Sequence, residues 1–290
     1  MFPSHMQKGT VLAFSGAFLL SFDTLLLRLI EGETLQIAFW RGVLMFVAGI
    51  STWSVVRIRG SKGLGLMNGL PGFYVAILYG LASIFFVASA TMTSIANMLV
   101  IVATAPLWAA ILAFAFFQEK TAIRTWRAFF AAFLGIVIVV WPGLSSGSNL
   151  GDVFALFTAT CMAGAFVLSR RSQANLALAP AVGGIFSVAF LAPFVPDFSF
   201  QSFGRPDFLM IEGMILVPLA LGLIAMAPRY IPATHVGLFL LLETVLGPTW
   251  IWIVIGEEPT LNAQIGGAIV IVALLAHSLF SIRSRSSLSS

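Results

Sequence analysis

Two distant stretches of the sequence share a pattern of proline, tryptophan and a closing glutamate. Residues 105–121 read APLWAAILAFAFFQEKT, and residues 243–260 read ETVLGPTWIWIVIGEEPT. Aligning Glu119 with Glu257 sets the two stretches 138 residues apart and places Pro106 opposite Thr244. Each stretch closes one long apolar run and leads into another, so an internal repeat is predicted.

The composition around these stretches is that of an integral membrane protein. Of the 290 residues, 59% are hydrophobic and only 9% are charged, whereas about 25% are charged in a soluble domain. So few charged side chains cannot cover a water-facing surface. A soluble domain, a disordered chain and a nucleic-acid-binding protein are therefore not expected, although the net charge is +4.

The chain contains ten apolar runs, each near the length of about 20 residues that a membrane helix needs. They are predicted at 9–30, 35–56, 70–91, 94–117, 125–142, 152–169, 177–196, 208–228, 233–255 and 261–281. If the N-terminus lies in the cytoplasm, twelve of the fifteen basic residues fall on the cytoplasmic side. Arg28 and Arg205 fall on the far side, and Arg41 lies within a span. This bias predicts a multi-pass protein with both termini in the cytoplasm.

The spans divide into two units of five, at residues 1–142 and 152–281, followed by a cytoplasmic tail at 282–290. Because five is an odd number, the second unit enters the membrane in the opposite orientation to the first. Such inverted repeats are typical of secondary transporters, whose site lies near the midplane between the halves.

The two five-helix units and the paired stretches resemble the drug/metabolite transporter superfamily, in particular its EamA-type members. The resemblance covers nearly the whole chain. It implies an all-α integral membrane fold of ten helices, alternating access, and movement of a small metabolite, often the export of amino acids or toxic compounds. The second unit departs from the family pattern, because Thr244 replaces the helix proline and Pro248 follows four residues later. Any break in the ninth helix is therefore expected about one turn further along.

Glu243 is the acid that lies deepest within a predicted span, about ten residues from either end of 233–255. An ionisable group at this depth costs about 2.5–3.5 kcal/mol on insertion scales, and such groups usually face the bundle interior or a watery cavity. We expect Glu243 to bind an amino or other cationic group of the substrate, or to carry a coupling proton. The alternative is a neutral acid that hydrogen-bonds to a neighbouring helix.

Asp23 and Arg41 are predicted to lie at equal depth on consecutive antiparallel helices. Each is about six or seven residues from the outer end of its span, or about 10 Å at 1.5 Å per residue. This position allows a salt bridge that is structural or gates the pathway. Direct recognition of a substrate carboxylate by Arg41 is the alternative. Glu212, near the outer start of the eighth span, is expected to be a solvated helix start.

Prolines inside two spans mark the expected hinges, Pro106 in the fourth helix and Pro248 in the ninth. Proline removes a backbone hydrogen bond and clashes with the preceding turn, so it kinks a helix. Trp108 and Tyr79 are expected to line a cavity for the substrate. The alternatives are an inert kink and, for tryptophan, a place at the membrane interface.

Signatures of catalysis and metal binding are missing from the sequence. No two of the three histidines have metal-ligand spacing, the single Cys161 cannot form a thiolate cluster, and no Walker A motif occurs. No enzyme activity, cofactor, metal or nucleic-acid partner is therefore expected.

We predict a secondary transporter in a bacterial inner membrane, a monomer or weak homodimer, that exports a small metabolite. The metabolite is an amino acid or an amphipathic compound, and protons are a candidate coupling ion. The alternatives are uptake of a vitamin or other amphipathic metabolite, and a non-transporting membrane scaffold or sensor.

Overall fold

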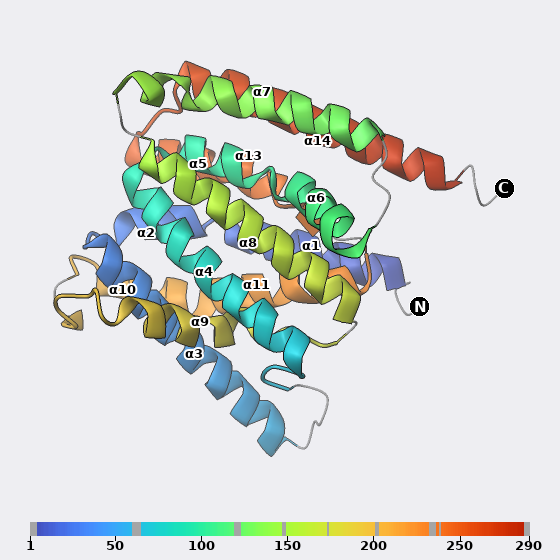
Figure 1. The fold of residues 1–290 in the computed structure, drawn as a ribbon. Helices are drawn as coiled ribbons and strands as arrows, with labels where there is room; N and C mark the ends of the chain where they lie inside the picture. The colour runs from blue at the N-terminus through green and yellow to red at the C-terminus, as the bar shows by residue number, and fades with distance from the viewer. Residues whose placement is uncertain are drawn as a thin grey trace.

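The computed structural model describes residues 5–59, 65–118, 123–146, 149–172, 174–200, 203–231, 236–237 and 239–286. This part of the chain is a bundle of helices without a β-strand (Figure 1). The helices are α1 (His5–Leu20), α2 (Asp23–Leu29), α3 (Thr34–Ile58), α4 (Leu70–Met92), α5 (Ile95–Val102), α6 (Ala105–Phe117), α7 (Ile123–Ser146), α8 (Leu150–Ser172), α9 (Ala179–Leu191), α10 (Pro206–Ile211), the π-helical turn η2 (Glu212–Leu216), α11 (Val217–Met226), the 3-10 turn η3 (Ala227–Arg229), α13 (Leu241–Ile255) and α14 (Leu261–Ser286).

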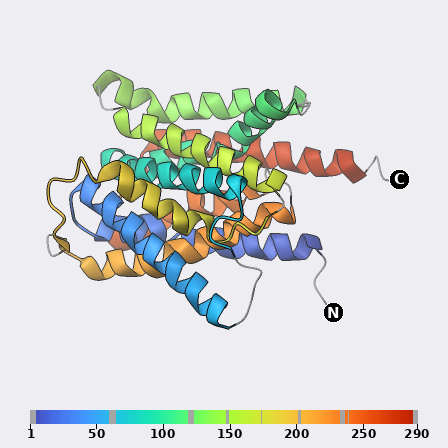
Figure 2. The same ribbon diagram turned by 60° about the horizontal axis from the view of Figure 1, so that its bottom comes forward.

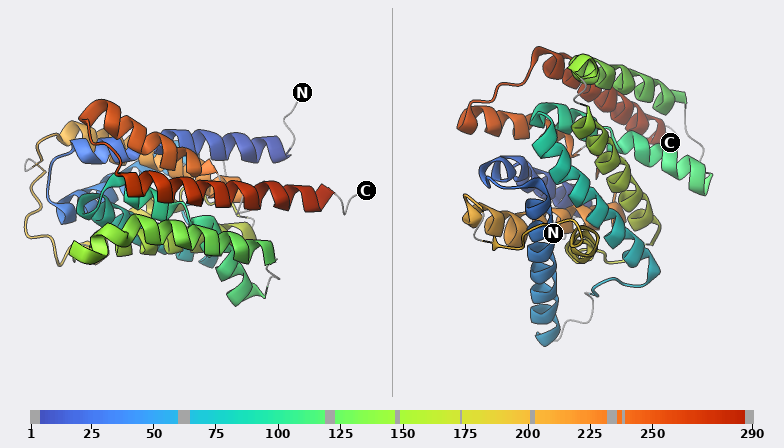
Figure 3. Two further views of the ribbon diagram at one scale, coloured as in Figure 1. Left: turned by 90° about the horizontal axis from the view of Figure 1, so that it is seen from above. Right: turned by 60° about the vertical axis from the view of Figure 1, so that its left-hand side comes forward.

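These helices account for the ten predicted membrane spans. Within the described ranges, six helical runs are long and apolar enough to cross a membrane: Met6–Leu29, Thr34–Ile58, Leu70–Met92, Ile95–Phe117, Leu150–Ser172 and Pro206–Arg229. Four shorter apolar helices complete the set: Phe130–Val139, Ala179–Leu191, Leu241–Ile255 and Leu261–Ala273. The predicted all-α fold is therefore confirmed. α1 begins and α14 ends at the same end of the bundle (Figure 3), as an even number of crossings requires.

Contacts between the halves follow a pseudo-two-fold relation. α4, the third span, packs on α8, the sixth, while α11, in the eighth span, packs on α1, in the first. α3 packs on α9, and α7 packs on α14. Figure 1 shows α7 and α14 side by side at one edge of the bundle. Figure 2 shows the bundle turned so that α3 comes forward. Exchanging the halves leaves these pairings unchanged, which is the arrangement of an inverted repeat.

The fourth span is broken next to its proline. α5 ends at Val102, and α6 begins at Ala105 after a turn. Pro106 accounts for the break, since its ring clashes with the helical carbonyl four residues earlier, that of Val102. Glu119, which closes this stretch in the repeat, lies outside the described residues.

The ninth span is interrupted at Leu240, one residue before α13 begins. This position corresponds to Val102 in the repeat, and Pro248 lies inside α13. The expected shift of the break by one turn is therefore wrong. The break instead lies where α13 of the ninth span contacts α5 of the fourth span, its counterpart in the other half. There the Thr244 hydroxyl donates to the Leu99 carbonyl over 3.3 Å.

Facing glycines allow three helix pairs to cross closely. A Cβ atom added to Gly184 of α9 would lie 2.2 Å from the carbonyl oxygen of Gly42 in α3. Reciprocal contacts of this kind also join Gly80 with Gly183 and Gly135 with Gly266. Small residues at such crossings let membrane helices pack through their backbones.

Gly184→Ala is expected to lower the free energy of unfolding by about 1–3 kcal/mol, because the new methyl group overpacks a backbone crossing. Thermal unfolding in detergent, followed by tryptophan fluorescence, measures the effect. Gly164→Ala is the matched control. Its Cβ would meet only the flexible ends of two leucine side chains, Leu78 at 3.2 Å and Leu112 at 3.9 Å, so its midpoint should match or exceed that of the wild type. Equal midpoints for Gly184→Ala and the wild type would contradict the prediction.

Candidate functional site

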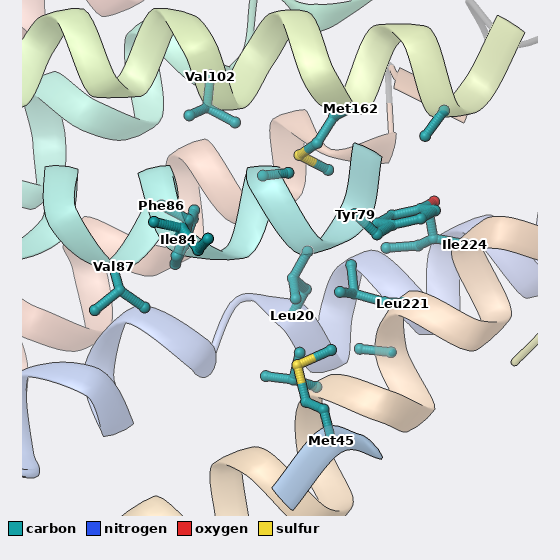
Figure 4. Close-up of a cluster of buried hydrophobic side chains, with 14 of the residues drawn as sticks. Leu20, Met45, Tyr79, Ile84, Phe86, Val87, Val102, Met162, Leu221 and Ile224 are labelled. Atoms are coloured by element: carbon teal, nitrogen blue, oxygen red, sulfur yellow. The ribbon is translucent and has the colours of Figure 1, made fainter. Parts of the chain in front are cut away.

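A cavity lies in the interior between helices of both halves. The space open to the centres of water molecules is about 30 Å³, which is enough for about two waters. Figure 4 shows Leu20, Tyr79, Met162 and Leu221 around this interior, each from a different helix. The walls are formed by Leu20, Asp23, Arg41, Tyr79, Ala82, Ser83, Phe86, Val102, Thr158, Met162, Leu221 and Glu243.

Arg41 borders the cavity and is held by two carboxyl groups. Its Nη1 and Nη2 atoms donate to Asp23 Oδ1 and Oδ2 over 3.2 and 2.8 Å, and Nη1 also forms an ion pair with Glu212 Oε1. The side chains of these three residues are 3% exposed or less. The structure thus brings Asp23 and Arg41 together as the predicted pair and adds a third member.

The burial of Glu212 shows that the prediction made for it from the sequence is wrong. It was expected to be solvated at the start of the eighth span, but it is fully buried. The helix begins earlier than predicted, at Pro206, and Glu212 opens the π-helical turn η2. Pro218 follows this turn; it offers no N–H, and its ring crowds the carbonyl of Met214. A widened turn relieves that clash, and π turns of this kind are frequent at functional sites.

Glu243 lies deeper than this cluster. It is twelve residues before the end of α13 at Ile255, or about 18 Å at 1.5 Å per residue, and it is 2% exposed. It occupies the first turn of α13, where the positive end of the helix dipole favours an anion. Its Oε1 atom has no hydrogen-bond partner in the described part of the chain.

Several other buried polar atoms of the cavity walls also lack a partner among the described residues. They are Tyr79 Oη, Ser83 Oγ and Arg41 Nε. A buried polar atom without a hydrogen bond costs about 1–3 kcal/mol. Unpaired donors and acceptors that converge on one apolar cavity are typical of a ligand site, where the ligand completes the hydrogen bonds.

The other predicted site residues lie away from the cavity walls. Trp108 packs with α8 side chains near Ala163 and Val167. Pro106 is buried at the start of α6, against Gly237. Pro248 borders a small hollow with Ile95 and Glu257. The structure therefore collects Glu243, Tyr79, Asp23 and Arg41 around one space, but not the tryptophan or the two prolines.

Comparison with known proteins gives the family. The model of the EamA-like transporter family matches residues 7–141 and 149–279, once for each half. The chain belongs to the EamA-like transporter family. The resemblance to drug/metabolite transporters is thus confirmed, and the protein is a multi-pass membrane transporter of small molecules.

Other comparisons bear on the fold alone. A solved crystal structure matches over 95% of this chain and 98% of its own, with a TM-score of 0.69 and 16% identity. No curated protein matches the sequence significantly.

Arg41→Met is expected to lower the free energy of unfolding by about 3–5 kcal/mol, because it leaves buried carboxyl groups without their countercharge. The shift in thermal midpoint of the purified protein measures this loss. Arg205→Met is the matched control. It removes a similar pair with Asp207, but those side chains are 51% and 54% exposed, so no measurable shift is expected. Equal midpoints for the two variants would show that the buried cluster does not hold the fold.

Proposed function

We propose that the protein exports a small amphipathic metabolite with an amino group, such as an amino acid, across a bacterial inner membrane. The observation that carries this proposal is the unpaired Glu243 carboxyl oxygen, which is buried beside the interior cavity. A carboxylate in such a place binds an ammonium group by a charge-assisted hydrogen bond, which is stronger than a neutral one. Glu243 is therefore the first candidate for substrate contact.

Arg41 offers the complementary contact. Its terminal nitrogens are taken by Asp23 and Glu212, while its buried Nε–H has no partner in the described chain. A donor at this point suits a substrate carboxylate. An amino acid would thus place its ammonium group at Glu243 and its carboxylate at Arg41. Leu20, Phe86 and Met162 supply apolar wall for a side chain.

Alternating access follows from the size of the cavity. Space for about two waters does not admit a metabolite, so the bundle must open for binding and release. The interruptions next to Pro106 and at Leu240 provide the hinges. On the outer side, Arg28 pairs with Glu257 over 3.4 Å and donates to the Thr93 carbonyl over 3.3 Å. These contacts, together with Asp23 and Arg41, close the outer path, and both termini lie in the cytoplasm.

Glu243→Gln is expected to abolish transport, because the amide is neutral and cannot bind the ammonium group as an ion pair. The measurement is uptake into inside-out vesicles of a labelled panel of amino acids, amines and vitamins, with an imposed proton gradient switched on and off. Glu258→Gln is the matched control, since it neutralises an exposed acid in the segment after α13.

Accumulation of one amino compound that is lost in Glu243→Gln and kept in Glu258→Gln would support the proposal. Full activity of a folded Glu243→Gln variant would refute the role of Glu243. If no compound accumulates, right-side-out vesicles test uptake of the same panel. Failure in both directions would favour a scaffold or sensor.

Tyr79→Phe is expected to leave the thermal midpoint unchanged or higher, because it removes a buried hydroxyl that lacks a partner. If the hydroxyl binds substrate, the same change raises KM for the compound found in the vesicle panel. A lower midpoint with unchanged KM would assign Tyr79 to packing alone.

A further inference from the structure

Negative charge exceeds positive charge around the cavity. The titratable groups that face it are Asp23 of α2, Arg41 of α3, Tyr79 of α4 and Glu243 of α13. Glu212 of η2 is not part of the lining but contacts Arg41. The lining residues from α1, α5, α8 and α11 carry no titratable group. With all three carboxyl groups ionised, one guanidinium would face three negative charges in a nearly dry space. Unpaired buried charges are very costly, so this cluster must hold protons.

The contacts indicate where one proton lies. Asp23 accepts both terminal nitrogens of Arg41 in a fork, which is the geometry of an ionised carboxylate. Glu212 contacts Arg41 only at Nη1, the same nitrogen that donates to Asp23 Oδ1, so the two carboxyl groups meet at one atom of the guanidinium. One guanidinium neutralises one carboxylate, so the second carboxyl group at this nitrogen is stable in the dry interior only when it carries a proton.

We propose that Asp23 and Glu212 together hold one exchangeable proton beside Arg41, and that this proton site, separate from Glu243, couples transport to the proton gradient. The coupling rests on the proposed function; the proton site does not. The two carboxyl groups contact the same nitrogen of Arg41 and therefore titrate as a pair. With the proton bound, Asp23, Arg41 and Glu212 have no net charge and are stable without water.

Release of the proton changes this balance. The O–H bond of the pair breaks, the proton passes to water, and its electron pair stays on the carboxyl oxygen, which leaves a net charge of −1. Because Glu212 is fully buried, this step requires η2 to move relative to α3 so that water enters. Closed and open forms of the cluster thus correspond to its protonated and deprotonated states.

An ammonium group bound to Glu243 favours the deprotonated cluster, because it neutralises the carboxylate that otherwise opposes a further negative charge in the same cavity. Proton and substrate therefore oppose each other's binding. Such a coupling is reciprocal by thermodynamic necessity, and it is the requirement for exchange of a proton against a substrate. This direction of coupling agrees with export driven by proton entry.

Infrared spectroscopy of the purified full-length protein tests the proton site without any substrate. A protonated carboxyl group has its own C=O stretching band, which shifts in D₂O. At neutral pH we expect the wild type to show such a band, Glu212→Gln to lose it, and Glu243→Gln to retain it. The glutamine side chain is neutral and has nearly the same shape as the protonated carboxyl group, and its amide oxygen can still accept from Arg41, so Glu212→Gln should keep the wild-type thermal midpoint.

A Glu212→Gln spectrum that retains every carboxyl band of the wild type would overturn the proposal. If that variant does not fold, Asp23→Asn serves in its place. Glu212 then becomes the carboxylate that pairs with Arg41, and the same band should disappear. Retention of the band in Asp23→Asn would equally overturn the proposal.

Vesicle transport separates this site from the substrate site. For the compound found in the panel, Glu212→Gln should still exchange labelled for unlabelled substrate but lose accumulation driven by the proton gradient. Glu243→Gln should lose both. Gradient-driven accumulation at the wild-type level in Glu212→Gln would refute coupling through this pair. If no compound moves, the proposed function fails while the infrared result still decides the proton site.

Discussion

The buried guanidinium of Arg41 is the constraint on which the interior depends. An arginine at this depth in a membrane must be paired, and its partners come from segments that are far apart in the sequence. Asp23 and Arg41 belong to the first half of the chain, whereas Glu212 belongs to the second. The ion cluster therefore joins the two repeats next to the cavity, where a transporter has to move one half against the other.

The two-fold symmetry applies to the backbone but not to the charges. Where α3 crosses α9, Gly42 faces Gly184. The residue before Gly42 is Arg41, but the residue before Gly184 is Gly183. In the repeated stretches, Glu243 corresponds to Ala105. Duplication explains the matched helix pairs. The polar site is formed by residues that one repeat has and the other lacks, although the two backbones are related by symmetry.

The ten spans could be predicted because hydropathy and the placement of basic residues report them directly. Counting residues from the outer membrane surface was enough to pair Asp23 with Arg41. If the eighth span had been predicted to begin at Pro206 instead of residue 208, the same count would have placed Glu212 at the depth of Asp23 and Arg41. The directions of the side chains could not be predicted, because broken helices change which face points inward. Trp108, two residues after Pro106, consequently packs on α8.

The π-helical turn has a consequence for how this site is inherited. Such a turn contains one residue more than an α-helical turn, and each residue of an α-helix rotates the chain by about 100°. Loss of one residue here would restore a regular helix. If the helix after the turn stayed in place, with Leu221 still in the cavity wall, Glu212 would rotate away from Arg41. In this lineage an ionisable cluster can therefore arise or vanish through a one-residue insertion or deletion. Column-by-column alignment of relatives would then place this acid opposite the wrong residue.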